Sequence, residues 1–123
     1  MAEGSNKMIG EFGDKPRTRG FAAAIEEYAR SQGGVESELK AQLSFSVKRK
    51  FLWLWAYQRT ADGTLYLNVR LDRKKDDSHF HDVTQVSKNR WNHHVVVRSE
   101  ESATSDWLRS LIEDGHEFGA KSS

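Results

Sequence analysis

The sequence predicts an α+β domain: a mainly antiparallel sheet of about five strands, with an N-terminal and a C-terminal helix packed on one face. Three observations lead to this prediction. Apolar and polar residues alternate from Leu43 to Val47, as in a half-buried strand. Short turn sequences join neighbouring apolar segments, as in antiparallel hairpins. Apolar residues recur at helical spacing near both ends of the chain, so each helix has one face to bury against the sheet.

Length and composition favour one globular domain. The chain has 123 residues, 37% of them hydrophobic, and no cysteine, which excludes disulfides and thiolate metal sites. It contains neither an apolar signal segment at its start nor an apolar run of about 18–20 residues, so we expect a cytoplasmic protein without a membrane partner. We expect residues 14–118 to form the domain, with a disordered leader over 1–13 and a frayed tail over 119–123.

The first helix is expected to begin near Asp14, as the capping residue, with Pro16 in its first turn. Gly33 and Gly34 then stop it. Its apolar stripe is Phe21, Ala24, Ile25 and Tyr28. Ser102 or Thr104 is expected to cap the last helix. The apolar stripe of that helix is Trp107, Leu108, Leu111, Ile112 and Gly115.

The central strands lie in the segment from Leu43 to Tyr57, and their turns decide which way the side chains point. A three-residue turn over 48–50 pairs Phe45 with Trp53, and a three-residue turn over 61–63 pairs Trp55 with Val69. This register predicts that one face of the sheet meets the helices and is rich in aromatic residues. Its members are Phe45, Phe51, Trp53, Trp55, Tyr57, Leu67 and Val69.

In the same register the opposite face carries an apolar strip with a polar rim, which is typical of an interaction site. We therefore predict a non-catalytic module that binds a protein or a small ligand there, or a second copy of the chain. The predicted binding residues are Leu52, Leu54, Tyr66, Asn68, Arg70, His94 and Arg98. A one-residue slip would reverse every side chain. Both leucines would then lie under a helix, and the aromatic row would become the candidate binding surface.

The charge distribution supports an alternative prediction, that the protein binds nucleic acid. The net charge is +1, but residues 40–98 carry twelve Lys/Arg and five Asp/Glu, hence +7, and the segments on either side are acidic. A sheet face that combines cations with a stacking aromatic such as Tyr66 is suited to single-stranded nucleic acid. The residues predicted to bind nucleic acid in this alternative are Lys48, Arg49, Lys50, Lys88 and Arg90.

Catalytic and metal-binding patterns are weak, so we expect no enzyme activity, no cofactor and no metal. The serines lie in turns, caps or strand faces, and no G-x-S-x-G or phosphate-binding glycine motif occurs. His93 and His94 are adjacent on a strand and point to opposite faces, so they cannot hold one ion together. A zinc site would need further ligands from His79, His81 or Asp82. The preferred interpretation is structural, with one histidine of the pair buried and hydrogen-bonded and the other exposed.

Three segments resemble a known family: SFSVKRKFLWLW, FHDVTQVSKNRWNHHVVVRS and WLRSLIEDGHEF. Their order is similar to that in a small bacterial family of domains of unknown function, sometimes labelled "predicted transport protein". The resemblance covers Val35 to Phe118 and implies no activity and no functional residue. Many members have a glycine-rich stretch near the late tryptophan, where this chain has Asn92, His93 and His94.

Overall fold

The computed structural model describes residues 6–121. In this part of the chain the two longer helices are α1 (Pro16–Ser31) and α3 (Asp106–Ala120), and the short helix α2 (Glu100–Ala103) precedes α3. The strands are β1 (Met8–Ile9), β2 (Glu36–Leu39), β3 (Leu43–Ser46), β4 (Lys50–Tyr57), β5 (Leu65–Leu71), β6 (Asp82–Ser87) and β7 (Arg90–Val97).

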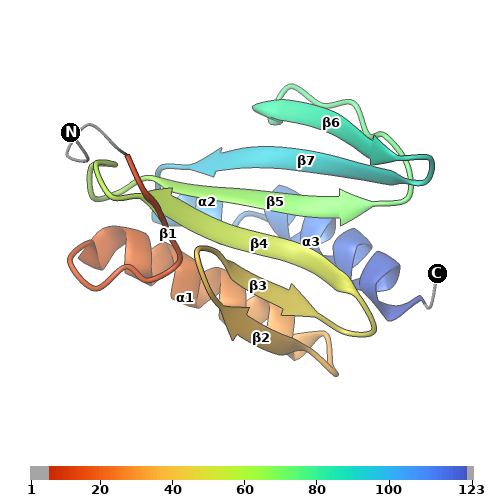
Figure 1. Ribbon diagram of the computed structural model, residues 1–123, viewed down its shortest axis with the longest axis horizontal. Helices are drawn as coiled ribbons and strands as arrows, with labels where there is room; N and C mark the ends of the chain where they lie inside the picture. The colour runs from red at the N-terminus through yellow and green to blue at the C-terminus, as the bar shows by residue number, and fades with distance from the viewer. Residues whose placement is uncertain (1–5, 122–123) are drawn as a thin grey trace.

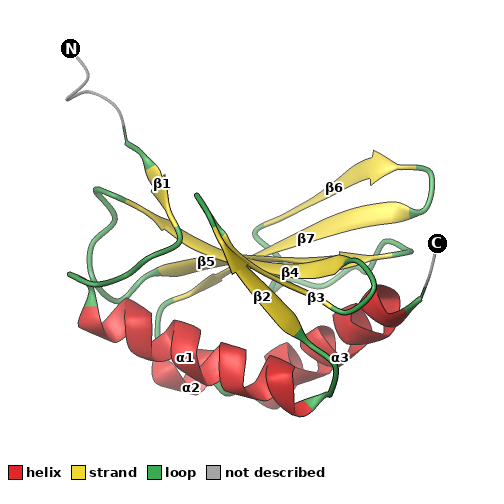
Figure 2. Ribbon diagram, turned by 60° about the horizontal axis from the view of Figure 1, so that its bottom comes forward, coloured by secondary structure: helices red, strands yellow, loops and turns green. Residues whose placement is uncertain are grey.

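These strands form one antiparallel sheet in the order β2-β3-β4-β5-β7-β6, and β1 pairs with the end of β4 (Figure 1). Figure 2 shows the helices on one side of the sheet, while β1 and β6 rise on the other side. The predicted α+β class and antiparallel sheet are confirmed. The sheet of the described residues has seven strands rather than about five, because β1 and β2 are short polar or terminal segments with weak strand signals.

The predicted orientation of β4 is wrong, and a β-bulge is the first reason. Ser46 pairs with Lys50, but Phe45 pairs with Leu52, so Phe51 is an extra residue on β4. A bulge places two residues opposite one and breaks the strict alternation of faces. Phe51 and Leu52 are consequently both fully buried in the core.

The second reason is the connection between β4 and β5, which runs over seven residues, 58–64, instead of a three-residue turn. The observed register pairs Leu54 with Leu67 and Trp55 with Tyr66. Leu52, Leu54 and Ala56 therefore belong to the buried core, whereas we predicted them on the outer face. The predicted core members that instead occupy the outer face are Trp53, Trp55 and Tyr57.

The core lies between this aliphatic face and the helices. Gly115 of α3 lies so close to the sheet that a Cβ there would be 2.6 Å from Val69 Cγ1 and 3.1 Å from the Phe51 ring. A side chain at this position would hold α3 away from β4 and β5. The side chains that form the core include Ile25, Phe45, Leu52, Leu54, Leu67, Val69, Leu108 and Ile112.

The N-terminus of α1 is held by the β4–β5 loop rather than by Asp14, which corrects the predicted cap. Lys15 occupies the capping position but makes no side-chain capping hydrogen bond, and its ammonium donates to the Gln58 and Thr60 carbonyls of the same loop. Instead the Asp62 carboxylate accepts hydrogen bonds from the backbone N–H groups of Arg17, at 2.9 Å, and Thr18, at 3.0 Å. A carboxylate at a helix N-terminus accepts hydrogen bonds from the free backbone N–H groups and interacts favourably with the positive end of the helix dipole. The loop thus acts as a cap supplied from the sheet.

The chain before α1 is more ordered than predicted. Met8 and Ile9 pair with Tyr57 and Ala56, and Phe12 is buried in the core. Residues 6–13 are therefore not a disordered leader, and residues 1–5 of the predicted leader lie outside the described residues. Helix α3 continues to Ala120, so the predicted tail begins within the helix, and residues 122–123 also lie outside the described part.

Candidate functional site

The outer face of the sheet carries a row of aromatic side chains. Trp55 stacks on Tyr66 with ring centroids 6.0 Å apart, and Tyr57 meets Tyr66 edge-on at 5.4 Å. His94 on β7 meets Trp55 edge-on at 5.7 Å. The antiparallel register places these rings on neighbouring strands, and because β1 and β6 rise on this side the face is concave (Figure 2). Offset and edge-on contacts of this kind hold the rings in defined orientations.

An arginine extends the row towards one end of the sheet. The Arg70 guanidinium lies 4.7 Å from the centroid of the Trp53 ring, and its Nε donates a hydrogen bond of 2.9 Å to the Asn92 side-chain oxygen. Stacking on an indole and bonding to an amide fix the planar cation in one position. Trp53, Arg70 and Asn92 are all half-buried, so their remaining surface faces the concave side.

These residues line a pocket of about 340 Å³, which also includes Met8 and Gln42. Two of its lining residues are nearly buried, Trp55 at 6% exposed and Asn68 at 5% exposed. Within the described residues, neither Trp55 Nε1 nor Asn68 Oδ1 has a hydrogen-bond partner. Buried polar atoms normally find a partner, and an unsatisfied one costs about 1–3 kcal/mol. Trp55 Nε1 and Asn68 Oδ1 therefore lie beneath the surface of this pocket without an internal partner in the described part of the chain.

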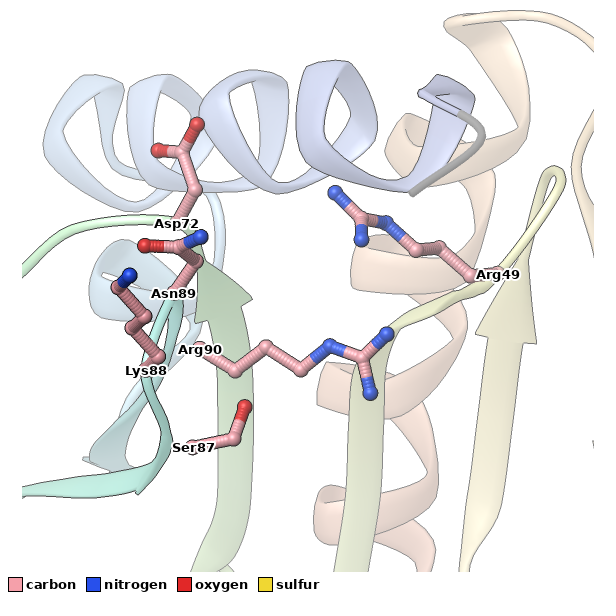
Figure 3. A pocket seen from close by; sticks show the side chains of 6 residues that line it. All are labelled: Arg49, Asp72, Ser87, Lys88, Asn89 and Arg90. Atoms are coloured by element: carbon pink, nitrogen blue, oxygen red, sulfur yellow. The ribbon is translucent and has the colours of Figure 1, made fainter.

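A second, basic pocket of about 490 Å³ lies at the end of the sheet where β4 and β7 begin and β5 ends. Figure 3 shows the guanidinium groups of Arg49 and Arg90 extending towards each other across this end. Arg49 is held in place, because its Nε donates to the Phe118 carbonyl at 2.9 Å and its guanidinium stacks 3.6 Å from the Phe118 ring. The other residues that line the pocket are Asp72, Ser87, Lys88 and Asn89.

The three arginines at this end of the sheet repel one another. Burial lowers the pKa of Arg70, and the positive charges of Arg90 and Arg49 lower it further. Burial also lowers the pKa of Arg49, with Arg90 adding to the effect and Asp72 opposing it. Guanidinium groups stay charged despite such shifts. The site therefore holds concentrated positive charge that an anion would relieve.

The structure brings half of the twelve predicted binding residues into these two pockets. Asn68, Arg70 and His94 line the aromatic pocket, Tyr66 stacks beside it, and Arg49, Lys88 and Arg90 line the basic pocket. The other predicted positions do not join them, for different reasons. Leu52 and Leu54 are buried under the helices.

Three predicted cations also lie apart from the site. Arg98 follows the end of β7 opposite to Arg90 and is exposed. Lys50 pairs with Glu38 at 2.8 Å, and this hydrogen bond, helped by Lys40, lowers the pKa of that carboxyl. Lys48 lies in the β3–β4 turn, where its backbone N–H donates to the Gly119 carbonyl at 2.9 Å.

Sequence reasoning missed the aromatic members of the site. Trp53, Trp55 and Tyr57 share a period of two, and so do Leu52, Leu54 and Ala56, so alternation alone did not decide which set faces the helices. The polarity of the cross-strand partners was the signal that could have decided the orientation. Trp53 pairs with Ser44 and Asn68, whereas Leu54 pairs with Leu43 and Leu67. A consistent polar face through three strands identifies Trp53 as an outer residue.

His93 has the structural role that we predicted for one histidine of the pair. It is fully buried, its Nε2 accepts a hydrogen bond from the Lys75 backbone N–H at 3.0 Å, and its Nδ1 lies 3.2 Å from the Val69 carbonyl. An Nε2 that accepts requires the proton on Nδ1, which then donates to Val69. Burial lowers the pKa of His93 and favours this neutral form. His94 lies on the opposite face and is half-buried.

Residues 6–121 contain neither a cluster of metal ligands nor a helix able to span a membrane. No three His, Asp or Glu side chains there are grouped closely enough to hold a metal ion. No helix in this range combines the length and the apolar character needed to cross a membrane.

Comparison with known proteins places the chain in a family. A family model described as "Domain of unknown function (DUF5655)" matches residues 11–119. Neither the curated proteins nor the solved structures contain a match to the chain. The match confirms the resemblance to a family of domains of unknown function and extends it towards the N-terminus beyond Val35. Because it covers most of the 123 residues, the chain belongs to the DUF5655 family of domains of unknown function.

Proposed function

We propose that this protein is a non-catalytic module that binds single-stranded nucleic acid on the outer face of its sheet. The observation that carries the proposal is the continuous arrangement of half-buried aromatic rings and unpaired arginines on one concave face. Sheet surfaces that bind single strands combine stacking aromatic rings with cations that follow the backbone. Both components lie on β4, β5 and β7 here.

The stacking surface has the right chemistry for bases. Trp53, Tyr66 and His94 offer planar rings, and Arg70 offers a planar cation stacked on Trp53. The eight residues of β4 extend over roughly 26 Å at about 3.3 Å per residue, so several nucleotides fit along the face. The unpaired Trp55 Nε1 donor and Asn68 Oδ1 acceptor lie beneath the accessible surface of this face, so a base reaches them only if neighbouring side chains move.

The electrostatics support the same partner. Within the described residues, Arg49, Arg70, Lys88 and Arg90 form no ion pair with a carboxylate, while many other surface cations do. A cation without an internal partner is free to bind a phosphate and to release its counterions.

Fluorescence anisotropy with labelled single-stranded DNA and RNA at low and moderate salt tests the proposal. We expect saturable binding that weakens with salt, with a slope of about −0.7 per phosphate contact. Trp53→Ala should weaken binding about 5- to 150-fold, which corresponds to about 1–3 kcal/mol for one stacked base. Arg90→Glu should weaken binding and flatten the salt dependence.

Arg19→Glu is the matched control, because it makes the same charge change on an exposed position of α1, away from the outer sheet face. Equal losses for Arg19→Glu and Arg90→Glu would mean that binding follows net charge and not this face. Absence of binding at low salt would reject the proposal. Sedimentation of the protein alone would then show whether a second copy covers the face instead.

A further inference from the structure

The basic pocket at the end of the sheet has a more specific composition than a general phosphate-binding surface. Its cations come from three separate places: the β3–β4 turn supplies Arg49, the β6–β7 turn supplies Lys88, and the first residue of β7 is Arg90. In Figure 3 the arginine side chains reach towards the same space from opposite sides. The two guanidinium groups define one compact position for an anion, and Lys88 adds positive charge at the edge of the pocket.

The charges of the pocket are not neutralised internally. In the described part of the chain, Arg49, Lys88 and Arg90 have no carboxylate within ion-pair distance. The one acidic residue of the pocket, Asp72, is engaged by Arg73 at 3.2 Å and by Lys121 at 3.3 Å. Arg49 is already aligned by the Phe118 carbonyl and ring, so its outer guanidinium nitrogens are presented without further ordering. Preorganised, mutually repelling cations favour an anion of high charge.

We infer that this pocket binds a terminal phosphate monoester, the phosphorylated end of a nucleotide strand. Three cations and one carboxylate give the lining a net charge of +2 (3 − 1 = 2). A phosphate monoester carries about −1.5 to −2 at pH 7 and offers three acceptor oxygens. An internal phosphodiester carries a single charge and two free oxygens, so it matches the pocket less well.

The pocket is continuous with the stacking surface, on whose proposed function this inference rests. Arg90 and Asn92 share one face of β7, a separation of about 7 Å along the strand. Asn92 accepts the hydrogen bond from Arg70, and Arg70 stacks on Trp53. A terminal phosphate near Arg90 therefore places the first base over Arg70 and Trp53. A free mononucleotide has the same chemistry, so the experiment must distinguish the two sources.

The test compares one short oligonucleotide prepared with a 5′-hydroxyl, a 5′-phosphate or a 3′-phosphate, each labelled at its other end. We expect one phosphorylated form to bind at least about tenfold more tightly than the hydroxyl form, as charge-assisted bonds require. Calorimetric titrations with adenosine monophosphate and adenosine form the second arm. A strand end is the ligand if the phosphorylated oligonucleotide binds more tightly than the mononucleotide.

Variants of the pocket residues test whether the preference for a phosphorylated end arises in this pocket. Lys88→Gln and Arg90→Gln should each reduce the preference for the phosphorylated end while binding of the hydroxyl form changes less. Arg19→Gln, on the exposed side of α1, should preserve the preference. Lys88 is exposed in a turn, so Lys88→Gln tests the pocket without risk to the fold. A preference that survives in both pocket variants would overturn the inference.

The outcomes separate this inference from the proposed function. Equal binding of all three oligonucleotides would overturn the terminal-phosphate pocket and leave single-strand binding intact. Binding of the mononucleotide but of no oligonucleotide would support the pocket and reject the strand-binding function. Absence of binding to every one of these ligands would reject both.

Discussion

The two faces of the central sheet are built from the same strands but differ in composition and in what covers them. On the helix face, Leu52 and Leu54 of β4 are fully buried and pack with other aliphatic side chains. On the outer face, Trp53 and Trp55 of the same strand lie among amides, histidine and arginine. The helix face of the sheet is covered by aliphatic packing, whereas the outer face has two buried polar atoms without a partner among the described residues and arginines that repel one another. The contrast shows that the two tryptophans of β4 lie on the side of the sheet that the helices do not cover, whereas the leucines between them form the core.

The largest expected effect separates the two faces of β4 directly. Leu54→Ala should lower the free energy of unfolding by about 2–5 kcal/mol, because it removes buried methyl groups and leaves a cavity. Trp53→Ala should cost less, since the Trp53 side chain is half-buried on the open face. Urea unfolding of both variants measures the difference. A larger loss for Trp53→Ala would show that the outer face is the true core.

A glycine pair tests how tightly the helix face is packed. Gly115→Ala should destabilise the protein by about 1–3 kcal/mol, because the new Cβ would lie 2.6 Å from Val69 Cγ1. Gly20→Ala in α1 is the matched control, since nothing lies within 4 Å of its added Cβ. That control should stabilise by about 0.5–1 kcal/mol through helix propensity. Effects of the same sign in thermal melts would contradict the close approach of α3.

The pH dependence sharpens the comparison, because one histidine lies on each face. Burial lowers the pKa of both His93 and His94 in the folded protein. The unfolded chain binds protons near its ordinary pKa of about 6.5, so it binds more protons than the folded chain just below that pH. Stability should therefore be complete above about pH 6.5 and fall as the pH drops towards the folded pKa values, by up to about 1.4 kcal/mol per pH unit for each histidine.

Denaturant unfolding between about pH 7 and pH 5 measures this slope. His94→Gln should remove only its own share, leaving the part due to His93. For His93, nearby Lys75 and Arg73 act in the same direction as burial. Stability that does not change over this range would contradict burial of neutral His93 beneath the Lys75 backbone.

The smallest expected effect concerns the unpaired acceptor of the outer face. Asn68→Leu replaces a buried amide whose Oδ1 lacks a partner with an apolar group of similar size. Removing an unsatisfied polar group should leave stability unchanged or raise it by up to about 1 kcal/mol. Nucleic-acid binding should weaken in the same variant, as expected where function is kept at the cost of stability. A clear loss of stability would show that Asn68 has a structural role.

Much of the fold was predictable because it depends on local signals. The stripe around Phe21 and Ile25, the stripe around Leu111 and Ile112, and the alternating strands all appear where the sequence placed them. The charge distribution predicted Arg49, Lys88 and Arg90 together with Lys48 and Lys50, and the structure brings the first three into one pocket. Burial of one histidine of the pair followed from the alternation of a strand.

The orientation of the sheet was not predictable from alternation, since Leu52-Trp53-Leu54-Trp55 is apolar on both faces. Hydrophobicity ranks tryptophan as a core residue, but the space beneath α3 is narrow, because Gly115 lies directly against Val69 and Phe51. The bulge at Phe51 and the seven-residue β4–β5 loop are backbone events without a local signature. Each of them shifts the pairing register of the strands, and the residue types in the turns do not reveal the size of that shift.

The sequence by itself determined the class of the fold, the apolar stripes of the two longer helices and the supply of cations and aromatic rings, because these follow from composition and short-range periodicity. Only the tertiary structure decided which face those rings occupy, which cations lack a carboxylate and which polar atoms stay unpaired. Each of these depends on contacts between residues far apart in the chain, such as Asp62 with the start of α1 or Lys50 with Glu38. The candidate site consists of the rings, cations and polar atoms that take part in none of those contacts.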